Sequence, residues 1–134
     1  MPNSPIIIDN TYFYHIHFVS IKRTFEILDG ENAGRLMSGE MERDIIGTYY
    51  NYSVEVDASE ASAWEYDYLF DVLSRPMDAH MITVPFGQET LTFRAYVTQG
   101  SDELVYMANG NNRWGGLSFN FIAMSPQRRP SDLT

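Results

Sequence analysis

Three histidines are the residues of this sequence best suited to binding a metal ion. His15 and His17 are two residues apart, so on one β-strand both side chains would point to the same face. A zinc site would need at least a third ligand, for which His80 or Asp78 is available. No ligand motif of known spacing accompanies them. We therefore predict ordinary strand histidines, with no metal site and no cofactor.

Two groups of acidic residues could supply the paired carboxylates of general acid–base catalysis. One group lies in a polar segment and comprises Glu40, Glu42 and Asp44. The other lies on a predicted helix and comprises Glu65, Asp67 and Asp71. The helix group falls on the face expected to be exposed, where burial cannot raise a carboxyl pKa. Because no serine elbow or phosphate-binding loop is present either, we predict no enzyme and no catalytic residues.

The charge of the chain argues against nucleic acid as a partner. The 134 residues carry a formal net charge of −9, and affinity for nucleic acid comes mainly from neutralising phosphates. There is no cysteine, which excludes disulfides and thiolate sites. No apolar stretch reaches membrane-spanning length, and the first ten residues lack the pattern of a signal peptide. We expect no nucleic acid and no membrane among the partners.

The elements that would position these side chains are mostly strands. β-Branched, aromatic and alternating apolar residues predict strands over residues 12–19, 21–28, 45–56, 81–85, 91–97, 103–108 and 117–123. The segment 45–56 shows the clearest alternation. One of its faces comprises Ile46, Thr48, Tyr50, Tyr52, Val54 and Val56.

One helix is predicted over residues 59–74, capped by Ser59 and ended by Pro76. Its apolar side comprises Ala63, Tyr66, Leu69, Phe70 and Leu73. The connections are too short for parallel crossovers except through this helix. We therefore predict a mainly β protein with one helix (α+β), an antiparallel β-sandwich or curved sheet with the helix packed on it.

The chain shows no internal repeat and no linker, so we expect a single domain over residues 1–134. Residues 1–5 and 127–134 are polar and are expected to be loose tails. Residues 29–44 interrupt the strand pattern with three glycines and are expected to form a long flexible loop. Loops of this length are typically functional or disordered.

Methionine, arginine and aromatic side chains are enriched at protein interfaces, and several lie in these segments. Tyr49 is expected on the polar face of its strand, and Trp114 lies in a Gly/Asn stretch that reads as a turn. Such aromatic rings suit a protein partner and also a sugar, so a carbohydrate-binding β module is the alternative function. The predicted interface residues are Arg35, Met37, Met41, Arg43, Tyr49 and Trp114.

Segments from Ile6 to Arg128 follow a recognisable order. Residues 39–46 lead into the tyrosine-rich strand, a short helix follows, and the chain closes with Trp114-Gly-Gly-Leu-Ser-Phe-Asn120. This order resembles a family of small uncharacterised proteins encoded among the tail genes of siphophages and prophages of Gram-positive bacteria. The glycine-rich, methionine-containing segment 29–41 departs from that pattern, which leaves its role open.

The resemblance implies a virion structural protein without enzymatic activity, as a tail, tail-tube or baseplate-associated component. It also implies a homo-oligomeric ring that contacts other phage tail proteins. Because flexible segments often become ordered only on assembly, we expect the loop 29–44 and both tails to be the assembly elements of such a ring. The expected location is then the virion, and the host cytoplasm during assembly.

Overall fold

The computed structural model describes residues 6–57 and 62–133, which form a mostly β structure with one α-helix. An antiparallel sheet of eight strands runs in the order β2-β1-β7-β8-β10-β6-β3, with β9 paired to β10, and β4 and β5 form a separate pair. The predicted fold class is confirmed. The elements are β1 (Ile7–Ile8), β2 (Thr11–Tyr12), β3 (His17–Asp29), β4 (Gly34–Arg35), β5 (Met41–Glu42), β6 (Ile45–Asp57), α1 (Ala63–Leu73), β7 (His80–Phe86), β8 (Glu89–Tyr96), β9 (Gly100–Ala108), β10 (Asn111–Ala123) and the 3-10 helix η2 (Pro130–Leu133).

β10 is the central strand of the fold. It pairs with β6 over Leu117–Phe121, with β9 over Asn111–Phe119, and with β8 at Ile122 and Ala123. Its apolar residues alternate towards the core as the sequence predicts. The buried set is Leu117, Phe119, Phe121 and Ala123.

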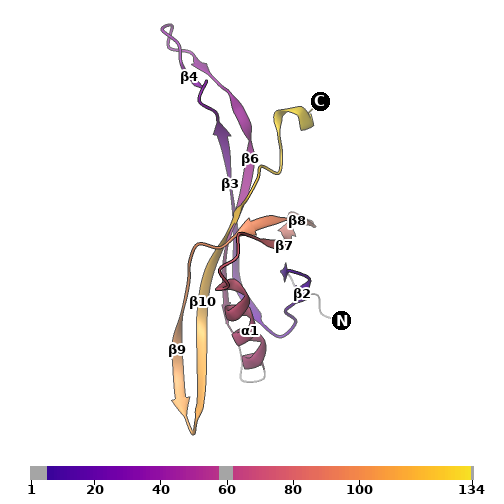
Figure 1. The fold of residues 1–134 in the computed structure, drawn as a ribbon, viewed down its shortest axis with the longest axis vertical. Coiled ribbons are helices and arrows are strands. Elements are labelled where there is room, and N and C mark those ends of the chain that lie inside the picture. The colour runs from indigo at the N-terminus through magenta and orange to yellow at the C-terminus, as the bar shows by residue number, and fades with distance from the viewer. Residues whose placement is uncertain (1–5, 58–61, 134) are drawn as a thin grey trace.

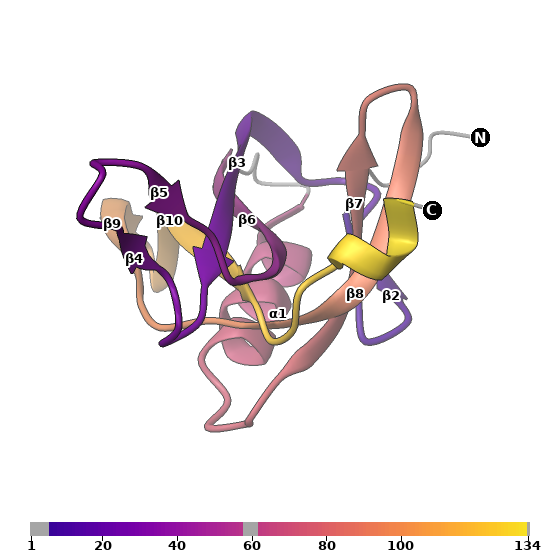
Figure 2. The same cartoon turned by 90° about the horizontal axis from the view of Figure 1, so that it is seen from above.

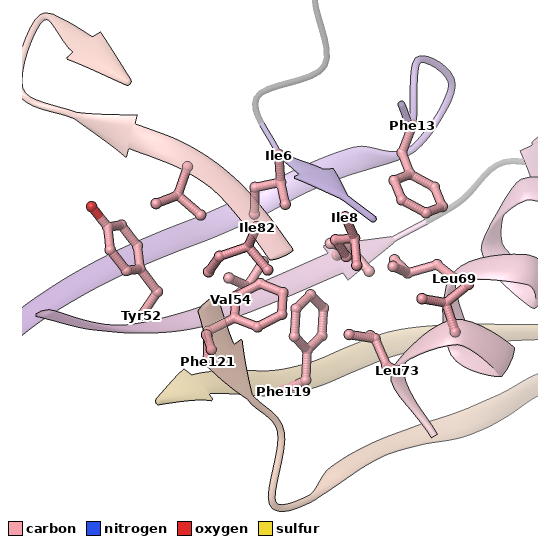
Figure 3. Packing of buried hydrophobic residues seen from close by; sticks show 14 of the residues in the cluster. Ile6, Ile8, Phe13, Tyr52, Val54, Leu69, Leu73, Ile82, Phe119 and Phe121 are labelled. Carbon is pink, nitrogen blue, oxygen red and sulfur yellow. The ribbon is translucent and has the colours of Figure 1, made fainter. Parts of the chain in front are cut away.

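The core lies where β10, β6, β7 and β8 meet α1 and the N-terminal strands (Figure 3). Val54 and Phe121 contribute from the sheet, Leu69 and Leu73 from the helix, and Ile8 from β1, all of them buried. Burying each such side chain contributes about 1.5–3 kcal/mol. These contacts therefore join segments that are far apart in the sequence.

The helix is shorter than predicted and its buried face is rotated. It covers Ala63–Leu73, and Ser59, the expected cap, lies outside the described residues. Tyr66, Leu69 and Leu73 are buried as expected, but Phe70 remains about 40% exposed (41%). No helix in the described ranges is long and apolar enough to cross a membrane.

The N-terminal region differs from the prediction. The first of the two strands expected here, over residues 12–19, is broken at residues 13–16, and the second, expected over 21–28, begins earlier, so that β3 runs from His17 to Asp29. The preceding residues fold into the β1–β2 hairpin, whose turn residues Asp9 and Asn10 both have positive φ (49° and 69°). Asn and Asp tolerate this left-handed conformation, and it suits a tight hairpin turn. The turn places β1 against β7, where Ile6 and Ile8 are buried.

β3 and β6 form a long hairpin that projects from one end of the molecule (Figure 1). β10 leaves β6 after the pair Phe121–Tyr52, so β6 continues towards the tip without β10 beside it. The segment 29–44, predicted as an irregular loop, closes this upper arm. It contains the β4–β5 hairpin, in which Arg35 pairs with Met41.

A second hairpin, β9–β10, projects in the opposite direction (Figure 1). Its outer part pairs Asn111 with Ala108, beyond the point where β10 meets β6 at Leu117. Trp114, predicted in a turn, lies within β10 in this lower arm. The turn itself is Asn109–Gly110, both with positive φ. Figure 2, seen along the length of the molecule, shows both arms set to one side of β7 and β8.

The C-terminal segment is held against the upper arm, contrary to the expected loose tail over residues 127–134. The N–H of Gln127 donates to the carbonyl of Thr48 at 2.9 Å, and Thr48 N–H donates to the carbonyl of Arg128 at 2.8 Å. A Cβ atom at Gly47 would lie 2.5 Å from the Arg128 carbonyl oxygen. Glycine is therefore required at this position for the tail to lie across β6.

Replacement of Phe121 by alanine should lower the free energy of unfolding by about 3–5 kcal/mol, because the ring is fully buried and its loss leaves a cavity. Phe25→Ala in the upper arm removes the same ring from an exposed position and should cost about 0.5 kcal/mol or less. Chemical denaturation of both variants measures the difference. Equal losses would contradict the assignment of the core.

Candidate functional site

The arm tip, residues 34–42, brings together three of the predicted interface residues. Met37 is fully exposed, and Met41 is nearly half exposed. The turn is closed by Leu36 N–H donating to the Glu40 carbonyl at 2.7 Å. Arg35 Nη1 donates to the Gly39 carbonyl at 3.0 Å. The tip therefore presents apolar side chains beside an arginine on an ordered turn.

Arg43, also predicted as an interface residue, has a partner at the base of the arm tip. Its Nε donates to both carboxylate oxygens of Asp29, at 2.8 and 3.0 Å. Asp44 N–H donates to the same carboxylate at 3.1 Å. The hydrogen bond from Arg43 lowers the pKa of Asp29. This pair joins the end of β3 to the segment that precedes β6, so Arg43 stabilises the base of the arm tip.

The upper arm has an aromatic face between its tip and the core. Phe86 stacks edge-on to Tyr50 at 5.1 Å between ring centroids, and the Arg23 guanidinium lies 5.2 Å from the Phe86 centroid. Phe25, cross-strand from Tyr50, is two-thirds exposed. Tyr49, predicted on the polar face of the strand that became β6, is partly buried and packs against the core.

A groove lies between α1 and the lower arm. Its lining is Tyr66, Asp67, Phe70, Asp102 and Trp114, and its volume is about 390 Å³. Phe70 and Trp114 are each about 40% exposed, at 41% and 40%. Volumes of this size fall within the range of ligand pockets. The groove is therefore an aromatic recess flanked by two carboxylates.

Tyr66 and Asp102 connect the two walls of this groove. The buried Tyr66 hydroxyl donates to Asp102 Oδ2 at 3.0 Å. Burial, and then the adjacent Asp102 carboxylate, raise the pKa of Tyr66 well above its usual value. The hydroxyl thus stays protonated and fixes the helix to β9.

Sequence reasoning singled out Trp114 but missed the other groove residues. Tyr66 and Phe70 have the spacing of the apolar side of a helix, which predicts core residues. Asp102 lies among residues typical of a turn, which indicates no binding role. No local pattern relates residue 67 to residue 102. The structure also separates Trp114 from Arg35 and Met37, since they lie on opposite arms.

The histidines and Glu65 occupy positions that the sequence did not indicate. His15 precedes β3, so it does not share a strand face with His17. Glu65, predicted on the exposed helix face, is buried and accepts the His15 backbone N–H at 2.8 Å. Glu65 Oε2 also lies 3.0 Å from His15 Nδ1. Helix packing therefore turns Glu65 inwards, where it holds the segment before β3.

His80 is buried separately, with Nδ1 2.7 Å from Asp9 Oδ2. The contact between His80 and Asp9 connects the β1–β2 turn to the start of β7. Within residues 6–57 and 62–133, no three His, Asp or Glu side chains are grouped so that they could hold a metal ion. The close contacts of His15 and His80 thus join structural segments.

The raised pKa of Tyr66 predicts an alkaline loss of stability. An unfolded tyrosine ionises near pH 10, whereas folded Tyr66 remains protonated, so stability is present below about pH 10 and falls above it. Tyr66→Phe should reduce this fall by up to about 1.4 kcal/mol per pH unit. Denaturant titrations between neutral and strongly alkaline pH measure it. Tyr14→Phe, at an exposed ring, is the control, and an identical slope in both variants would refute the prediction.

Glu65→Ala should lower the free energy of unfolding by about 1–3 kcal/mol, because it removes the acceptor of the His15 N–H. Glu65→Gln keeps one acceptor oxygen and should lose less. Asp67→Ala, on the same helix but exposed, should change stability by about 0.5 kcal/mol at most. Thermal and chemical denaturation measure the relative stabilities of the three variants. A Glu65→Ala variant as stable as Asp67→Ala would contradict the prediction.

No protein-family model matches this chain, and a search of curated proteins finds no match either. The function is therefore inferred from the two arms and the groove between helix and arm.

Proposed function

We propose that this chain is a structural protein of a phage or prophage virion, acting as a tail, tail-tube or baseplate-associated component. It assembles with copies of itself into a ring and with other tail proteins, and it needs no enzymatic activity. The observation that carries this proposal is the pair of arms that project from the core with apolar side chains uncovered.

The upper arm exposes more apolar surface than an isolated hairpin would favour. Uncovered side chains there are Phe25, Ile27, Leu28, Leu36, Met37, Met41, Ile45 and Ile46. Two-stranded hairpins are marginally stable in water unless a face packs against something else. The C-terminal segment covers only part of the arm, around Thr48. A partner that covers the remaining face would stabilise the arm and bury these side chains.

The lower arm repeats this arrangement at the other end. Its uncovered side chains are Leu104, Val105, Tyr106, Met107 and Trp114. A single exposed leucine needs no explanation, whereas several exposed apolar side chains gathered on one projecting element favour an interaction site. Two separate surfaces suit an assembly in which each copy contacts two neighbours.

The sheet has open edges that suit the same assembly. Within the described part of the chain, β3 pairs only with β6 and β9 pairs only with β10. Such edges offer unpaired N–H and C=O groups, and a strand of another chain can complete them. Contacts between unlike surfaces of identical copies close into a ring when the rotation permits.

Substitution in the upper arm tests the proposal. The purified wild-type protein should form oligomers whose mass rises with concentration, as measured by size-exclusion chromatography with light scattering. Phe25→Lys should weaken this association, because a charge replaces an apolar ring on the aromatic face. Thr24→Lys adds the same charge to the neighbouring residue of β3, which points to the opposite face, and should have a smaller effect.

A wild-type protein that stays monomeric at high concentration would contradict self-assembly. Mass spectrometry of particles purified after prophage induction tests the virion role directly. Glycan binding by a monomer, abolished in Trp114→Ala, would instead favour the carbohydrate-binding alternative.

A further inference from the structure

The groove between α1 and the lower arm has the chemistry of a site for a cationic side chain. Tyr66, Phe70 and Trp114 supply aromatic rings, and Asp67 and Asp102 supply carboxylates. An aromatic face attracts a guanidinium or ammonium group through its quadrupole, and a nearby carboxylate adds an opposite charge. Apolar side chains next to that cationic residue in the bound partner would pack against the same aromatic rings.

Both carboxylates of the groove lack a cationic partner within the described chain. Asp67 and Asp102 take part in none of the ion pairs formed among residues 6–57 and 62–133. From the residues that the structure describes, Asp102 accepts a hydrogen bond only from the neutral Tyr66 hydroxyl, on one of its two carboxylate oxygens. A partner that brings a cation would therefore complete the groove.

The arm tip at residues 34–42 carries the complementary groups. Arg35 forms no ion pair among the described residues, and its guanidinium is bonded only to the Gly39 carbonyl. Met37 is fully exposed beside it, and Leu36 is half exposed. A thioether packs favourably against aromatic rings, so the tip matches the groove in both charge and apolar character.

The tip and the groove of one chain lie far from each other. The upper arm extends away from α1 and β9, which lie towards the other end of the molecule (Figure 1). The tip of the same chain is therefore not the occupant of its groove, whereas a second copy of the chain can bring its own tip to it. Contacts between unlike surfaces of this kind propagate from copy to copy and produce a ring or a filament.

We propose that the arm tip of one copy docks in the groove of the next, with Arg35 between the aromatic rings and the two carboxylates and Met37 against the rings. This inference rests on the proposed self-assembly and names the two surfaces that make it. It also explains why the structure positions Arg35, Met37 and Trp114 on opposite arms.

Charge reversal on each surface provides the test. Arg35→Glu and Asp67→Arg should each weaken self-association by about tenfold or more, because like charges then face each other. A mixture of the two variants should recover association, since the glutamate tip fits the arginine groove and the unchanged tip fits the unchanged groove. Arg129→Glu and Asp78→Arg, which make the same charge changes at exposed positions elsewhere, should behave as wild type.

Trp114 fluorescence locates the contact. In a Trp64→Phe background, the emission of the remaining tryptophan should shift to shorter wavelength as wild-type oligomers form, and should not shift with Arg35→Glu. Oligomers that form equally well in Arg35→Glu and Asp67→Arg would overturn the docking while leaving self-assembly intact. A wild-type chain that never associates would overturn both. A Trp114 response to soluble glycans, without any response to protein concentration, would assign the groove to sugar and overturn the docking.

Discussion

The backbone pairing of β10 is the constraint on which the rest of the structure depends. One side of this strand hydrogen-bonds to β6, while β9 and then β8 pair along its length. Along the ladder with β6, Leu117, Phe119 and Phe121 point to the same face, because side chains alternate along a strand. A shift of one residue would turn these three side chains to solvent and place Ser118 and Asn120 in the core. Burial of the apolar face therefore specifies the register of all three neighbours.

The shared strand also explains why the molecule has two arms. β10 accompanies β6 only as far as Tyr52, and β6 accompanies β10 only from Leu117 onwards. Past these two points each strand continues with a single partner, β3 or β9, and the two extensions run in opposite directions (Figure 1). The N-terminal hairpin packs between the two extensions, and the helix also lies beside the lower arm, where the groove forms. Stability is therefore concentrated in the middle, and the exposed apolar surface at the ends.

The alternation of apolar and polar residues predicted the strands well where one face of a regular sheet is buried in the core. The alternation in β6, β8 and β10 places Val54, Phe93 and Phe119 in the core as expected. It failed between residues 12 and 16, because the apolar residues there pack individually after a turn at Asp9 and Asn10. It also missed the order in the segment 29–44, where backbone pairing and the Arg43–Asp29 contact hold glycine-rich chain in a hairpin. Neither the individual packing of residues 13–16 nor the hairpin within residues 29–44 leaves a regular spacing of apolar residues in the sequence.

The sequence by itself determined that this is a mainly β chain with one helix, since alternation and helical spacing are local properties of the residues. It also singled out Arg35, Met37 and Trp114 by residue type. Only the tertiary structure decided where these side chains lie: Trp114 in a groove with Tyr66 and Asp102, Arg35 and Met37 at a distant tip, and Glu65 turned into the interior. The physical reason is that these positions depend on strand pairing and helix packing between segments far apart in the chain, which no local pattern encodes.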